Sequence, residues 1–102
     1  MIEMNKELFS QYVMEEKPVL VEFWAPWCGY CRRIGPAMDK ISQKYEGQMT
    51  VGKINIDEEP LLANQEQIEV IPTLILYRKG QAVASIVAPE SRAKIEEFLL
   101  EN

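Results

Sequence analysis

Two cysteines separated by two residues are the part of this sequence best suited to chemistry. Cys28 and Cys31 are the only cysteines, and the chain contains no histidine. A tetrahedral zinc site takes four Cys, His or carboxylate ligands, so the two sulfurs would fill half of one and we expect no metal. Mechanisms that need a histidine base, including Ser/His and Cys/His hydrolysis, are excluded. The chemistry that remains is that of cysteine or of carboxylates.

The neighbouring sequence favours a redox role for this pair. A run of β-forming residues, Val19 to Trp24, precedes the cysteines, and apolar residues at helical spacing follow them. Cys28 is therefore expected at the N-terminus of a long helix, where unpaired N–H groups and the helix dipole stabilise a thiolate. Cys31, three residues on, is placed to attack a mixed disulfide formed on Cys28. The alternative is a permanent structural disulfide, but closing so small a loop gains little entropy.

Hydrophobic periodicity predicts the elements that must position the cysteines. The expected order is a helix over 6–15, a strand over 19–24, a helix from Cys28 that stops at Gly47, a strand over 50–56, a short helix over 58–68, strands over 73–77 and 82–87, and a final helix containing Ile95, Phe98 and Leu99. The last two strands are expected to form a hairpin that turns at Lys79 and Gly80. This order predicts an α/β fold, a mixed sheet with helices on both faces.

Length, composition and charge limit the classes of protein that remain. The chain has 102 residues, 47% hydrophobic and 26% charged, which is typical of a single globular domain over 1–102. The apolar stretches are far shorter than the roughly 20 residues that span a bilayer, and the first residues lack the pattern of a secretory signal. We therefore expect a cytoplasmic protein that binds no membrane. With a formal charge of -5 and no basic patch, nucleic acid is not an expected partner.

Four blocks of the sequence resemble the thioredoxin family. They are VEFWAPWCGYC, KINIDEEP, IEVIPTLILYRKG and IEEFLLEN, in the order and spacing of the family, and together they extend over nearly the whole chain. The resemblance implies a thioredoxin-like fold, in which a central mixed sheet is flanked by helices on both faces. Only MIE, at residues 1–3, is left to form the first strand of the family. That strand is expected to be short or missing.

The resemblance also implies an activity. Such a protein is a protein-disulfide reductase, a thiol-disulfide oxidoreductase in which Cys28 is the nucleophile and Cys31 the resolving thiol. It binds no cofactor, because its redox-active disulfide Cys28–Cys31 receives electrons from thioredoxin reductase, which draws on NADPH. Its substrates are disulfide-containing proteins. We expect a monomer that serves electron transport and cell redox homeostasis.

Two further residues are implied to act in catalysis. Glu22 occupies the position where most thioredoxins have a buried aspartate implicated in proton transfer with the resolving cysteine, and Lys53 matches the lysine that accompanies it. A buried carboxylate tends to have a raised pKa, which suits acid/base work near neutrality. The extra methylene of glutamate moves the carboxyl group relative to Cys31. The alternative is that Glu22 and Lys53 form a buried pair with a purely structural role.

The resemblance places other residues around the substrate. Ile71 and Pro72 match the cis-proline segment that faces the cysteines and pairs its backbone with an extended substrate chain. Trp27 matches an exposed tryptophan beside the nucleophile, whereas Trp24 is expected to pack in the core below it. Ala88 replaces the glycine that usually completes the substrate groove.

The dipeptide between the cysteines departs from the family pattern, because Gly29-Tyr30 stands where Gly-Pro is usual. Tyr30 keeps an N–H that proline lacks, and its phenolic O–H is expected near the sulfur. Either effect raises the potential from roughly -270 mV for thioredoxin towards roughly -200 to -230 mV for glutaredoxins. This favours a second interpretation, a glutaredoxin-like or isomerase-like oxidoreductase coupled to glutathione. A third, from another class, is a thioredoxin-fold binding module whose cysteines are incidental.

Overall fold

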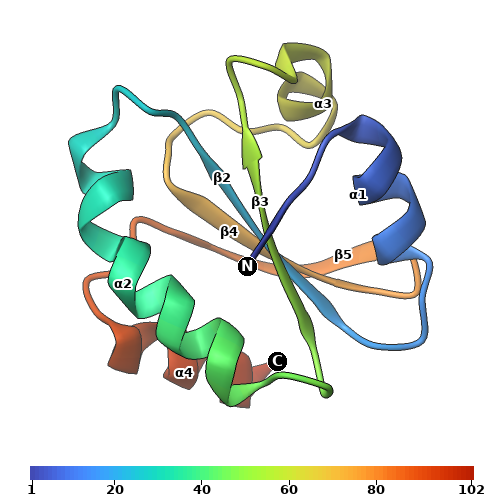
Figure 1. Cartoon of the computed structure of the whole chain (residues 1–102), viewed down its shortest axis with the longest axis vertical. Coiled ribbons are helices and arrows are strands. Elements are labelled where there is room, and N and C mark those ends of the chain that lie inside the picture. Colours follow the sequence, from blue (N-terminus) through green and yellow to red (C-terminus); the bar gives the residue numbers. More distant parts are fainter.

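A mixed five-stranded sheet forms the centre of the molecule (Figure 1). The computed structural model describes residues 1–102. The strands are β1 (Ile2–Glu3), β2 (Val19–Trp24), β3 (Thr50–Asn55), β4 (Thr73–Arg78) and β5 (Gln81–Val87). They lie in the order β1-β3-β2-β4-β5; the first three of these are parallel, and β4 and β5 are antiparallel to their neighbours. The predicted mixed sheet is confirmed, and so is the short first strand.

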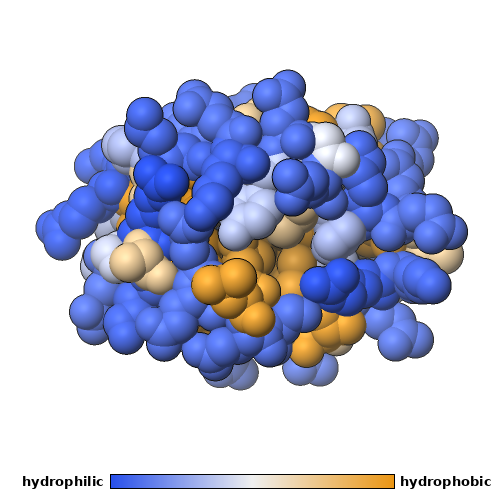
Figure 2. Space-filling model, turned by 90° about the horizontal axis from the view of Figure 1, so that it is seen from below, coloured by the Kyte–Doolittle hydropathy of each residue, from blue (hydrophilic) through white to orange (hydrophobic).

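Four helices cover the two faces of the sheet. Helices α1 (Lys6–Val13) and α3 (Pro60–Gln65) lie on one face, and α2 (Gly29–Lys44) and α4 (Arg92–Glu101) lie on the other (Figure 1). Seen from below, hydrophilic side chains cover most of the surface, and a smaller group of hydrophobic side chains is visible between them (Figure 2). No helix is long and apolar enough to cross a membrane. The arrangement confirms the predicted α/β class.

The central position of β2 explains its nearly continuous apolar sequence. Leu20 and Val21 are both fully buried, but Leu20 packs with α2 and α4, whereas Val21 packs with α1 and α3. Successive side chains of a strand point to opposite faces, so a strand that is covered on both faces has no solvent-facing position. Glu22 shares the face of Leu20 and is 3% exposed. The strand therefore carries one carboxyl group into the core beneath α2.

Two of the predicted helices are shorter in the structure, one because of a contact with a distant segment and one because of a local turn. The prediction that the first helix reaches Glu15 is wrong, because α1 ends at Val13. The carbonyl oxygen of Val13 accepts a hydrogen bond from the N–H of Gly80 at 2.6 Å, so it is not available to a further helical turn. Helix α3 is shorter than the segment 58–68, and Gln67, with a φ of 61°, adopts the left-handed conformation that ends many helices.

The N-cap of α1 provides a test of local stability. The Asn5 side chain accepts a hydrogen bond from the N–H of Leu8 at 2.9 Å. We expect Asn5→Ala to lower the free energy of unfolding by about 1 kcal/mol, because this N–H loses its acceptor. Asn5→Asp retains an acceptor at the helix start and should keep wild-type stability. Urea titration measures both variants, and equal losses in the two would contradict the prediction.

Candidate active site

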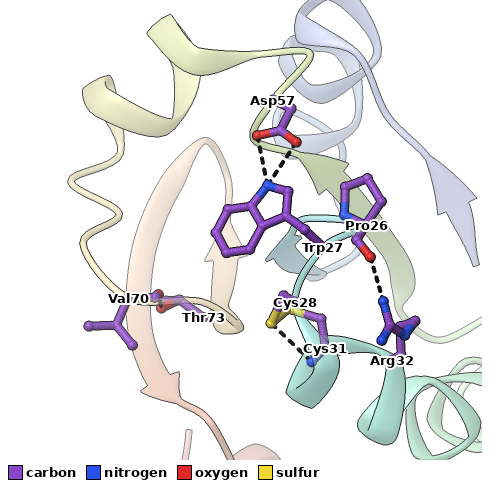
Figure 3. The surroundings of a disulfide bond; sticks show 8 residues. All are labelled: Pro26, Trp27, Cys28, Cys31, Arg32, Asp57, Val70 and Thr73. Carbon is purple, nitrogen blue, oxygen red and sulfur yellow. Dashed lines mark hydrogen bonds between the residues drawn. A yellow bond between two sulfur atoms is a disulfide. The ribbon is translucent and has the colours of Figure 1, made fainter.

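The two cysteines lie where the chain passes from β2 into α2, and they form a disulfide (Figure 3). Their Cα atoms are 5.3 Å apart. Cys28 is the N-cap of α2, and the N–H of Cys31 donates a hydrogen bond to the Cys28 Sγ at 3.1 Å. Cys28 is 9% exposed and Cys31 is 4% exposed. The predicted position of Cys28 at a helix N-terminus is confirmed, and Cys28 is the more accessible of the two.

Backbone donors at the start of α2 favour negative charge on the Cys28 sulfur. The first N–H groups of a helix have no intrahelical acceptor and carry partial positive charge. The N–H of Cys31 is one of these, and it points at the sulfur (Figure 3). The guanidinium of Arg32 donates to the carbonyl oxygen of Pro26 at 2.7 Å, which ties the segment before Cys28 to the helix. This is an environment that stabilises a thiolate relative to a thiol.

The loop before β4 lies next to the disulfide and contains a cis peptide bond between Ile71 and Pro72. Ile71 packs against the small apolar cluster that includes both cysteines. The Thr73 hydroxyl donates to the carbonyl oxygen of Val70, which closes the loop ahead of the strand (Figure 3). The N–H of Ala88 donates to the carbonyl oxygen of Pro72 at 2.8 Å. The cis bond that the resemblance implied is therefore present beside the dithiol.

Trp27 lies on the surface directly before the cysteines. Its side chain is exposed, with 65% of the residue accessible to solvent. The indole Nε1–H donates to the carboxylate of Asp57, at 2.9 Å to Oδ2 and 3.3 Å to Oδ1 (Figure 3). Asp57 was not among the residues predicted for the site, although its place just beyond β3, at the same sheet edge as the end of β2, was a signal. The Asp57 carboxylate holds the indole by its Nε1–H and leaves most of the side chain exposed.

Glu22 is a buried carboxyl group on the face of the sheet that α2 covers. Burial raises its pKa to about 7; the positive charge of Lys53 opposes the shift, and the negative charge of Asp39 on α2 adds to it. The carboxyl group makes no hydrogen bond to another residue in the structure. Protonated and ionised forms of Glu22 are therefore both populated near neutral pH, as acid/base work requires.

The buried Glu22–Lys53 pair, which was the alternative to a catalytic role, is not formed as an ion pair in the structure. The two residues are register partners on β2 and β3, but the Lys53 Nζ forms its ion pair with Glu3 on β1, at 3.6 Å. The same ammonium lies 4.7 Å from the centroid of the Trp24 ring. The exposed Glu3 carboxylate and the Trp24 ring thus hold the Lys53 ammonium on the side of β3 that faces the edge strand β1. Lys53 acts on Glu22 through its charge and not through an ion pair within 4 Å.

The phenol of Tyr30 also departs from the prediction, because it does not point at the sulfurs. Its O–H donates to the carbonyl oxygens of Pro89 at 3.1 Å and Ala88 at 3.3 Å, in the turn after β5. The single phenolic proton is shared by these two acceptors and is not available to sulfur. Gly29, in contrast, is exposed, and a Cβ built on it would meet no atom within 4 Å. Gly29 therefore exposes its backbone to solvent, whereas the Tyr30 side chain is hydrogen-bonded to the turn after β5.

The structure brings part of the predicted site together at the dithiol. Tyr30 and Ile71 pack against the cysteines, and Trp27 and Gly29 adjoin Cys28 along the chain. Ala88 is joined by hydrogen bonds to Tyr30 and Pro72, and Glu22 and Lys53 are register partners on β2 and β3. No group of three or more His, Cys, Asp or Glu side chains is placed to hold a metal ion. The arrangement supports thiol-disulfide exchange at Cys28.

Comparison with known proteins identifies the family of this chain. The family model described as Thioredoxin matches residues 1–101. Thioredoxin of Synechocystis sp. is 51% identical over 92 residues, which are 89% of this chain and 86% of the relative. Thioredoxin 1 of Synechococcus elongatus and Thioredoxin 1 of Nostoc sp. are 50% and 45% identical over the same shares. The chain belongs to the thioredoxin family and is a thiol-disulfide oxidoreductase.

Proposed function

We propose that this protein is a protein-disulfide reductase that thioredoxin reductase recharges with electrons from NADPH. The observation that carries the proposal is the hydrogen bond from the Cys31 N–H to the Cys28 Sγ at the start of α2. It marks Cys28 as the sulfur on which negative charge is stabilised and Cys31 as its neighbour within reach. We place the reaction in the cytoplasm, a reducing compartment, with the protein acting as a monomer.

The reaction proceeds through two exchanges. The Cys28 thiolate attacks one sulfur of the substrate disulfide, so that a Cys28–substrate bond forms and the first substrate sulfur leaves as a thiolate. Cys31 loses its proton and attacks the Cys28 sulfur, which forms Cys28–Cys31 and releases the second substrate sulfur. Two electrons pass to the substrate, both of whose sulfurs become thiols on protonation. The reductase then returns two electrons to the Cys28–Cys31 disulfide.

Glu22 is the proposed base for the second exchange. Its carboxyl group lies behind α2, and its pKa of about 7 lets the ionised form accept the Cys31 proton and the neutral form return one. Lys53 favours the ionised form of Glu22. The competing interpretation is a structural role for the buried carboxyl group, and the two interpretations differ in their kinetic consequences.

Exposed groups around Cys28 form the proposed binding surface for the substrate chain. The backbone at Ile71 and Pro72 lies beside the disulfide, where an extended segment can pair with it. Gly29 adds no side chain on the opposite side, so a substrate backbone can approach closely. The Trp27 indole, held by Asp57, offers an apolar face next to the reacting sulfur. Polypeptide disulfides suit this surface.

The activity itself is tested by insulin reduction with two electron supplies. We expect turnover with thioredoxin reductase and NADPH, none with Cys28→Ser, and a trapped mixed disulfide with Cys31→Ser, because the resolving thiol is then missing. Glutathione with glutathione reductase should support less turnover. Faster turnover with glutathione would favour the glutaredoxin-like alternative, and no turnover with either supply would contradict both.

The base is tested with Glu22→Gln. We expect resolution of the mixed disulfide to slow on the order of tenfold to a hundredfold at pH 8, since the amide accepts no proton. In the wild type this rate should fall as the pH drops through about 7, and the variant should lose that dependence. Stopped-flow measurement of substrate release gives both quantities. An unchanged rate would support the structural interpretation.

Stability measurements separate this effect from misfolding. The folded-state pKa of Glu22 is raised from 4.5 to about 7, so the folded wild type binds the proton more tightly and loses stability as the pH rises between these values. Glu22→Gln carries no charge there and should be more stable than wild type at pH 8, by roughly 3 kcal/mol. Glu16→Gln, at an exposed site before β2, is the matched control. It should change neither the rate of mixed-disulfide resolution nor the stability at pH 8.

The effect of the dipeptide on the potential is tested with Tyr30→Pro. Tyr30 is the second residue of α2, a position where proline is tolerated but removes an N–H that faces the start of the helix. Loss of this donor weakens the stabilisation of the thiolate in the reduced protein. We expect the potential to fall by about 30 mV, towards that of an ordinary thioredoxin. Equilibration in glutathione buffers measures it, and an equal or higher potential would contradict the prediction.

A further inference from the structure

Tyr30 connects two separate parts of the site. It lies in the first turn of α2, between the two cysteines, and its ring packs against both the cluster around the dithiol and the cluster beneath α2 and α4. Its hydroxyl reaches the carbonyl oxygens of Ala88 and Pro89, beyond the end of β5. The guanidinium of Arg33 lies 5.5 Å from the ring centroid. The side chain is therefore anchored along its whole length.

The turn that Tyr30 reaches has few other hydrogen bonds, although Pro89 is buried and Val87 pairs with Thr73 on β4. Ala88 has a φ of 45°, in the left-handed region that is unfavourable for a residue with a Cβ. Pro89 has no N–H with which to bond. The N–H of Ala88 donates to the carbonyl oxygen of Pro72, but the carbonyl oxygens of Ala88 and Pro89 accept no hydrogen bond from any residue except Tyr30. The phenol is thus the only link by hydrogen bonding between this turn and the dithiol helix.

Two hydrogen bonds in series connect α2 with the Ala88–Pro89 turn and the turn with the cis-proline loop. One runs from α2 through the Tyr30 hydroxyl to Ala88, and the other runs from the Ala88 N–H to Pro72, at 2.8 Å. Pro72 follows Ile71, which packs against the cysteines. The Tyr30 hydroxyl therefore adds a restraint between α2 and this turn, which the pairing of Val87 with Thr73 already places beside the cis-proline loop.

We propose that Tyr30 is a positioning residue, whose phenol holds the Ala88–Pro89 turn against the dithiol helix so that the cleft accepts an extended polypeptide disulfide. The proposal rests on the proposed reduction of protein disulfides. A polypeptide that lies along Pro72 must pass this turn, whereas a small disulfide reacts at Cys28 without touching it. Loss of the hydroxyl should therefore weaken the binding of protein substrates and leave the chemistry of the sulfurs unchanged.

The test uses Tyr30→Phe, which removes the hydroxyl alone. Reduced protein is mixed with increasing insulin, or with the small disulfide 5,5′-dithiobis(2-nitrobenzoic acid), without any reductase. We expect the half-saturating insulin concentration to rise about fivefold, as for the loss of one neutral hydrogen bond, with an unchanged limiting rate. The rate with the small disulfide and the redox potential should match wild type. Hydrogen exchange at the Ala88 amide should become faster.

Tyr45→Phe is the matched control. Tyr45 caps the other end of α2, and its hydroxyl donates no hydrogen bond to another residue, so this variant should behave as wild type. An unchanged half-saturating concentration in Tyr30→Phe would overturn the proposal. So would an equal loss with both disulfides, or a shifted potential, because the phenol would then act on the sulfurs. Failure of the wild type to reduce insulin would instead contradict the proposed function.

Discussion

The hydrogen bond from the Cys31 N–H to the Cys28 sulfur depends on α2 starting directly after Cys28. Each residue turns an α-helix by about 100°, so a start shifted by one residue would point a different N–H at the sulfur and turn Cys31 away from it. The start is set by β2, whose pairing with β3 and β4 fixes where the strand ends at Trp24. The chemistry of the dithiol therefore depends on the register of the sheet.

Features set by neighbouring residues could be predicted from the sequence, and features set by distant ones could not. Strand β2 has the predicted bounds, and the hairpin turns at Lys79 and Gly80, both of which have positive φ. The end of α1 depends on a hydrogen bond to Gly80, far along the chain. The partner of Lys53 depends on Glu3, which lies on the two-residue strand β1. Periodicity and caps contain no information about such partners.

In the site, too, features set by the local sequence could be predicted and features set by distant residues could not. The cysteines, the cis-proline and the burial of Glu22 followed from a local motif, from the family blocks and from a central strand. The role of Asp57 and the direction of the Tyr30 phenol did not, because each depends on which loop lies opposite in the folded chain. The phenol was expected near sulfur since the two are adjacent in sequence. In the structure the nearby carbonyl oxygens of Ala88 and Pro89 are stronger acceptors than sulfur, and they take the proton.

Tyr30 therefore influences the site through two groups that act at different places. Its backbone N–H belongs to the start of α2 and acts on the charge of the dithiol, as a proline there could not. Its hydroxyl acts on the turn after β5 and through that turn on Pro72. In this chain Tyr30 also bonds the turn after β5, so the role that we propose for it allows potential and substrate preference to change independently at one position.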